Sequence, residues 1–249
     1  MHATMHARFT PVTEPAPAPT SVLARSAGSR FAIAARYGLY TALLAALFPL
    51  LLRVAATEDA YVFRENGPME WAQAAMLAAA AVLFCFAARR QPERRTLLLF
   101  LAAGMSVAVL RELDAVWHGW IHAVPRKAPA VAGGVVLLAL AWRARRRLLP
   151  QMATFLRSRG FAILWAGTVI AGLLAQLGGQ GAFLEALTGV EFDRSFKRVT
   201  EETGEVFGYA VVMLGALETA LARRREARAA PRRVVRERAP IGQMILRSS

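Results

Sequence analysis

Six apolar runs with almost no charged residues are the feature that most constrains this chain. A helix crosses the apolar core of a bilayer with about 20 mostly apolar residues, within a usual range of about 17–25. Some of the runs are shorter, but neighbouring apolar residues extend them, and arginine side chains at their ends can reach the interface. The runs are Tyr37–Leu52, Trp71–Ala88, Thr96–Leu110, Ala128–Trp142, Gly160–Leu184 and Val206–Ala222, the last interrupted by Glu218.

The composition agrees with a membrane protein. Of the 249 residues, 56% are hydrophobic and 19% are charged, whereas a soluble domain has about 45–50% apolar and about 25% charged residues. This content excludes a disordered chain, and the single cysteine excludes a disulfide-stabilised scaffold. The alternating pattern of membrane-barrel strands is absent from the sequence. We therefore predict an all-α, polytopic membrane protein built as a bundle of about six transmembrane helices.

The basic residues predict the orientation and the partners of this bundle. Most of the 31 Lys and Arg residues fall on the side of the N-terminus, the even-numbered loops and the C-terminus. The positive-inside rule then predicts an N-in/C-in protein of the cell inner membrane. Next to a span, the basic inner segments favour anionic lipid headgroups over nucleic acid. A membrane protein partner is compatible with this surface.

Three segments follow from this topology. Residues 1–30 are rich in Pro and Ala and are expected to form a flexible cytoplasmic tail. Residues 31–222 are expected to form the six-span bundle, and residues 223–249 a basic cytoplasmic tail. A cleaved signal peptide is the alternative interpretation of the first apolar run.

Charged residues at the outer ends of the spans form three clusters. One cluster precedes the second span, one follows the third span, and one begins the sixth span. In a six-span bundle all three lie on the same side of the membrane, so we expect them to form one polar site. The clusters cover residues 64–70, 111–122 and 197–205.

A metal site is the more specific of two interpretations of these clusters. Asp114, His118 and His122 follow one another at intervals of four residues, which places them on one face of a continuous third helix. Two imidazoles at this spacing can hold Zn²⁺, and a carboxylate can complete the site. Glu201 is the predicted ligand from the sixth span. Such an ion would activate water for hydrolysis.

In this interpretation, Glu202 and Glu205 are the candidate catalytic residues, because either carboxylate could serve as the general base. The chain would then be a metal-dependent hydrolase of a lipid or another membrane-proximal substrate. The alkaline ceramidase-like membrane hydrolases hold zinc with an aspartate and histidines from several spans. Here both histidines of the bundle lie on one segment, so no family is assigned.

The alternative interpretation is that these charges hold the bundle together. Arg111 and Asp114 have the spacing of an ion pair within one helix, as do Lys197–Glu201 and Arg198–Glu202. On an ideal helix Glu112 points about 100° away from Arg111, so it would contact another neighbour. The protein would then be a non-catalytic assembly or interaction protein, or a small proton-linked carrier. The sequence does not decide whether the chain is an enzyme.

Glu70 is predicted to have a structural role at the start of the second span. A carboxylate there is stabilised by the helix dipole, with Asn66 as the N-cap and Pro68 in the first turn.

Overall fold

The computed structural model describes residues 19–57, 62–64, 66–190 and 193–222. Over these residues the chain is helical with short connections and contains no strand. Five helices are long and apolar enough to cross a membrane, and a bent helix pair provides a sixth span if it is counted as one. The all-α character and the multiple apolar spans predicted from the sequence are therefore confirmed.

The chain divides into two compact units, Met1–Arg53 and Val54–Ser249. Helix α1 (Pro19–Thr57) accounts for the described part of the first unit, and its apolar span covers Phe31–Ala56. The helix thus begins within the segment that we expected to be a flexible tail. Residues 1–18 and the predicted C-terminal tail, 223–249, lie outside the described residues.

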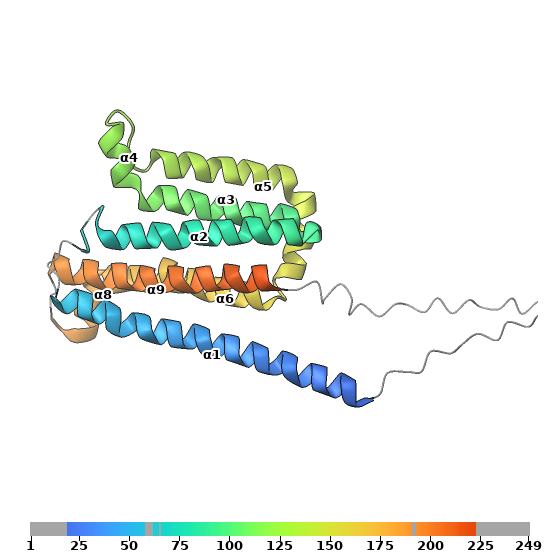
Figure 1. Ribbon diagram of the computed structural model, residues 1–249. Helices are drawn as coiled ribbons and strands as arrows, with labels where there is room; N and C mark the ends of the chain where they lie inside the picture. Colours follow the sequence, from blue (N-terminus) through green and yellow to red (C-terminus); the bar gives the residue numbers. More distant parts are fainter. Residues whose placement is uncertain (1–18, 58–61, 65, 191–192, 223–249) are drawn as a thin grey trace, which may run out of the picture. The chain divides into compact units, whose positions relative to one another are not determined.

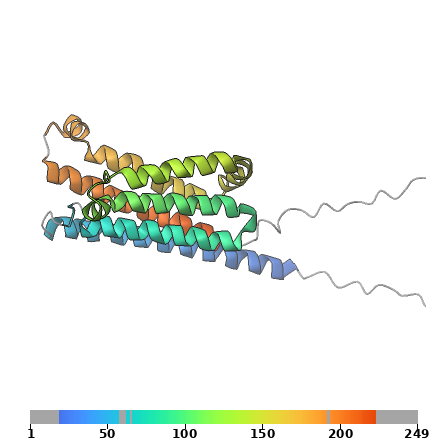
Figure 2. The same ribbon diagram turned by 90° about the horizontal axis from the view of Figure 1, so that it is seen from above.

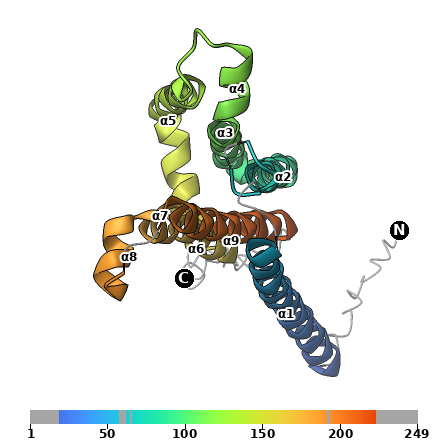
Figure 3. The same cartoon turned by 90° about the vertical axis from the view of Figure 1, so that its left-hand side faces the viewer.

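The second unit is organised around α9 (Arg194–Leu221). Helix α2 (Pro68–Arg90) packs against both α9 and α3 (Arg95–Glu112), and the short η1 (Pro92–Arg94) links α2 to α3. Figures 1 and 2 show α2, α3 and α9 running side by side. Helix α5 (Ala128–Phe155) lies along α3 (Figure 3). Fully buried apolar side chains of these helices, among them Phe84, Leu97, Leu98 and Phe155, form the main core.

Helix α2 begins at a tight turn rather than at the predicted cap. Its N-cap is Gly67, and Pro68 occupies the first turn. Asn66, predicted to be the cap, lies one residue earlier in the left-handed conformation with φ +60°. Its backbone N–H donates a hydrogen bond of 2.6 Å to Oε2 of Glu70. Glu70 therefore supports the helix start as expected, but the predicted role of Asn66 is wrong.

The third span is broken where the sequence predicts a continuous helix. Helix α3 ends at Glu112, and the short α4 (Asp114–Trp120) continues at an angle of 63° to it (Figure 3). His122 lies beyond the end of α4. The predicted single polar face from Arg111 to His122 is wrong, because residues after the bend no longer continue the rotation of α3.

The fifth apolar run also contains several elements. Helix α6 (Arg159–Val169) is capped by Ser158, whose side chain accepts a hydrogen bond from the Phe161 N–H. A π-helical turn, η2 (Ile170–Leu174), leads into α7 (Ala175–Gly179), and α8 (Gly181–Thr188) follows as a separate helix. The span therefore ends at Gly179. A π-turn shifts the phase of the residues that follow it, and Gln176 is the second residue after this one.

Glycines allow α6 and α9 to approach closely. A Cβ atom at Gly167 would lie 2.6 Å from the Val212 nitrogen and 2.7 Å from the Gly208 carbonyl oxygen. A Cβ atom at Gly215 would lie 2.6 Å from the Leu164 nitrogen. These distances are too short for any real contact, so the backbones meet only because both helices carry glycine. Seams of small residues are a usual way for membrane helices to associate.

Candidate functional site

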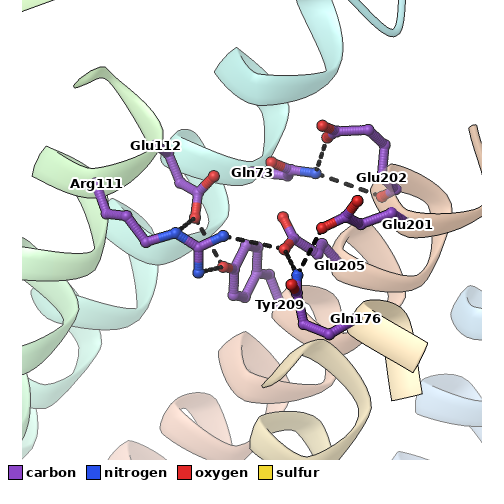
Figure 4. Close-up of polar contacts among 8 residues, drawn as sticks. All are labelled: Gln73, Arg111, Glu112, Gln176, Glu201, Glu202, Glu205 and Tyr209. Atoms are coloured by element: carbon purple, nitrogen blue, oxygen red, sulfur yellow. Dashed lines mark hydrogen bonds and ion pairs between the residues drawn. The ribbon is translucent and has the colours of Figure 1, made fainter. Parts of the chain in front are cut away.

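A network of polar side chains joins four helices of the second unit. It combines carboxylates, carboxamides, a guanidinium and a phenol, and Figure 4 shows them directed toward one another. All of them come from membrane-span candidates or from the third span before its bend. Its members are Gln73 of α2, Arg111 and Glu112 of α3, Gln176 of α7, and Glu201, Glu202, Glu205 and Tyr209 of α9.

Arg111 is the centre of this network. Its Nη2 donates to Oε1 of Glu205 at 3.0 Å, and its Nε lies 3.5 Å from Oε1 of Glu112. Tyr209 completes the arrangement, since its hydroxyl donates to the same Glu112 oxygen at 2.7 Å and accepts from Arg111 Nη1 at 3.4 Å. One guanidinium thus connects the end of α3 to the middle of α9.

The two carboxylates bound by Arg111 are buried. Glu112 is 7% exposed and Glu205 is 3% exposed, while the Arg111 side chain is 55% exposed. Among the described residues, Arg111 is the only cation that pairs with either glutamate. With all three groups ionised, this cluster carries one negative charge in excess. Buried charge without a counter-charge is costly, so this imbalance is the main electrostatic property of the site.

Gln176 extends the network from Glu205 toward Glu201. Its Nε2 donates hydrogen bonds of 2.8 Å to Oε1 of Glu201 and to Oε1 of Glu205. The two helices approach closely here, because a Cβ atom at Gly204 would lie 2.9 Å from the Cα atom of Ala175. Glu201 is only half-buried and lies one turn closer to the start of α9. The network therefore leads from a buried carboxylate toward the end of the helix bundle.

Gln73 joins α2 to the same region of α9. Its side chain is fully buried, and its Nε2 donates to Oε2 of Glu202 at 2.8 Å and to the Glu202 carbonyl oxygen at 3.3 Å. Its Oε1 accepts no hydrogen bond from any described residue. A buried carbonyl oxygen that lacks a donor is unusual, so the site has unused hydrogen-bonding capacity beside Glu202.

The predicted zinc ligands are not brought together. The imidazole Nδ1–H of His118 donates to the Val124 carbonyl oxygen at 3.2 Å, and that of His122 donates to the His118 carbonyl oxygen at 2.6 Å. Over the described ranges, no three His, Cys, Asp or Glu side chains are placed to hold a metal ion. Glu201 takes part in the network, apart from Asp114 and the two histidines. The zinc site stays a prediction of the sequence that this geometry does not favour.

Two of the three predicted ion pairs within single helices, Arg111–Asp114 and Lys197–Glu201, do not form among the described residues. Arg111 binds Glu112 and Glu205 rather than Asp114, so both the predicted partner of Arg111 and the predicted separation of Glu112 from it are wrong. Glu201 accepts from Gln176, and Lys197 forms no ion pair with the described acidic residues but extends over Gly181. The Arg198–Glu202 pair stays a prediction.

Sequence reasoning missed the neutral members of the network. Gln73, Gln176 and Tyr209 lie within apolar runs and carry no charge, so a site predicted from clusters of charged residues did not include them. The available signal was the presence of a carboxamide in a membrane span, where a polar group needs a hydrogen-bond partner. Gln73 lies about one turn after the charge cluster at residues 64–70, and Gln176 lies within one turn of the pair Gly178–Gly179.

The fold and this site together describe an all-helical protein with multiple apolar spans and a carboxylate-rich network between them. No protein-family model, no curated protein and no solved structure matches the chain.

Proposed function

We propose that this chain is a small proton-linked carrier of the cell inner membrane and that Glu112, Arg111 and Glu205 form its proton-binding centre. The observation that carries the proposal is the sharing of one guanidinium by two buried carboxylates from different spans. Ionisable groups within membrane spans are costly to maintain, and they commonly mark proton or ion pathways.

The charge balance explains why a proton would bind here. When both glutamates are ionised, the cluster has one negative charge that Arg111 does not neutralise. A single proton on either carboxylate makes the cluster neutral while the hydrogen bonds of Arg111 and Tyr209 keep it in place. The two carboxylates then share one titration, since each one changes the field that the other experiences. A centre that alternates between two charge states is what a proton-linked carrier requires.

The remaining members of the network connect this centre to water. Gln176 links buried Glu205 to half-buried Glu201, and Gln73 holds Glu202 on the neighbouring side of α9. Both outer glutamates lie closer than Glu205 to the start of α9. In the proposed N-in/C-in topology this end faces the outside, so the centre would exchange protons with the outer aqueous phase.

Infrared spectroscopy of the purified protein in lipid nanodiscs tests the proton-binding centre directly. As the pH is lowered, a band of a protonated, buried carboxyl group should appear with an intensity of about one group per chain. Glu205→Gln should remove this band, because the carboxamide mimics the neutral carboxyl group and cannot titrate. The variant should stay folded, since the carboxamide oxygen can still accept from Arg111 and Gln176.

Glu185→Gln provides the matched control, since Glu185 is an exposed acid on α8 and its loss should leave the buried-carboxyl band unchanged. A band that persists in both Glu205→Gln and Glu112→Gln would refute the assignment. Proteoliposomes holding a pH-sensitive dye then test the linkage to transport. Pulses of candidate solutes should drive proton movement in the wild type and none in Glu205→Gln.

A further inference from the structure

A groove between α3 and α5, apolar along most of its length and lined by arginines at one end, contains none of the residues of the network. The groove has a volume of about 600 Å³. Its walls are apolar, with Leu99 and Phe100 from α3 and Leu137 and Leu140 from α5. The outer surface of α5 beside it is also apolar and exposed, as Val135 and Leu138 show. A groove of this kind, open beside an exposed apolar helix face, suits a hydrocarbon chain better than water.

Three arginines line one end of the same groove. All three are exposed, and Arg146 and Arg147 lie three and four residues after Arg143, so both are neighbours of Arg143 on the same side of α5. None of them has a hydrogen-bond or ion-pair partner among the described residues. Arg145 behaves differently, because its guanidinium lies 4.3 Å from the ring centre of Trp142 and donates to the Trp142 carbonyl oxygen.

The position of these arginines along α5 matches the depth of lipid phosphates. The apolar part of the helix begins at Ala128, and Arg146 and Arg147 follow after about 27 to 29 Å of helix, close to the thickness of the apolar core of a bilayer, about 30 Å. Arg143 lies one turn earlier, from where its long side chain can extend to the same interface. Guanidinium groups bind phosphate oxygens with two parallel hydrogen bonds and are suited to this role.

We infer that this groove is a binding site for an anionic phospholipid. One acyl chain lies along Leu99, Leu137 and Leu140, and the headgroup phosphate binds the three arginines. Three positive charges in one place complement more than one negative charge. A lipid with two phosphates, such as cardiolipin, is therefore expected to bind more tightly than phosphatidylglycerol, and phosphatidylcholine least tightly. This inference is independent of the proton-binding centre.

Native mass spectrometry of the full-length protein, titrated with each of the three lipids, measures the number and affinity of bound molecules. The triple variant Arg143→Gln, Arg146→Gln, Arg147→Gln should lose roughly a hundredfold in cardiolipin affinity, given roughly a factor of five for each arginine near anionic lipid. The matched control changes Arg89, Arg157 and Arg159 to Gln. It removes the same charge from exposed positions outside the groove, and it should keep the wild-type affinity.

A second variant tests the groove without changing any charge. Ala103 lines the apolar wall, and Ala103→Phe should fill the space of the acyl chain and weaken cardiolipin binding while the arginines stay intact. Equal losses in both triple variants would show diffuse attraction and overturn the site. An unchanged affinity in Ala103→Phe, tight binding of phosphatidylcholine, or displacement of cardiolipin by inorganic phosphate would overturn it as well. Should the groove triple variant not fold, Ala103→Phe decides alone.

Discussion

Arg111→Ala is expected to lower the free energy of unfolding by roughly 3 kcal/mol, near the low end of the range for breaking a buried ion pair because Arg111 itself is half-exposed. The cost arises from what the variant leaves behind. Glu112 and Glu205 would lose their only described cationic partner while both remain buried. Unfolding of the purified protein in mixed micelles with increasing denaturing detergent, followed by tryptophan fluorescence, measures this change.

A double variant separates the charge effect from lost packing. In Arg111→Ala with Glu205→Gln, one of the two stranded carboxylates becomes neutral. We expect the double variant to be more stable than Arg111→Ala alone, which is the sign of coupling that a double-mutant cycle detects. Lys127→Ala is the control, since Lys127 is exposed before α5 and its loss should change stability by less than about 0.5 kcal/mol. A cycle with no coupling would contradict the central position of Arg111.

The helices could be predicted from the sequence because the length and hydrophobicity of an apolar run are the properties that allow a helix to cross a membrane. Every apolar run lies in helical structure, although the run Gly160–Leu184 is divided among several elements, and charged residues mark where most of the runs end. The interruptions could not be predicted in the same way. The third span bends at Leu113 with neither glycine nor proline at that position, and the π-turn at Ile170–Leu174 has no distinctive composition.

The contacts of the site could not be predicted from the sequence. Two of the three predicted charge clusters contribute to the network, through Arg111, Glu112 and Glu205, and the cluster at residues 64–70 contributes no member to it. Spacing within one helix suggested Asp114 as the partner of Arg111, whereas the observed partner lies 94 residues away on α9. Local periodicity describes which side chains share a face, and it says nothing about which helix that face meets. That information depends on packing, such as the glycine contacts that set the approach of α7 and α9.

The close approach of η2 and α9 gives the second large expected effect. A Cβ atom at Gly208 would overlap the backbone nitrogen of Ala171 and lie 2.7 Å from its Cα atom. No rotamer change relieves a contact with backbone atoms, so Gly208→Leu forces the two helices apart. We expect a loss of about 3 kcal/mol or more in the free energy of unfolding, measured by the same detergent titration. The separation should also disturb Tyr209, the next residue on α9, and through it the hydrogen bond to Glu112.

Gly172→Leu is the matched control for this effect. Gly172 lies in the π-turn one residue after Ala171, yet nothing lies within 4 Å of a Cβ atom placed there. The same side chain added at this position should change stability by less than about 1 kcal/mol, because it extends into open space. Equal losses in both variants would mean that leucine is poorly tolerated at both positions whether or not a backbone lies against it. A loss confined to Gly208→Leu would mean that the contact between the two backbones holds α9, and with it the carboxylate network, in place.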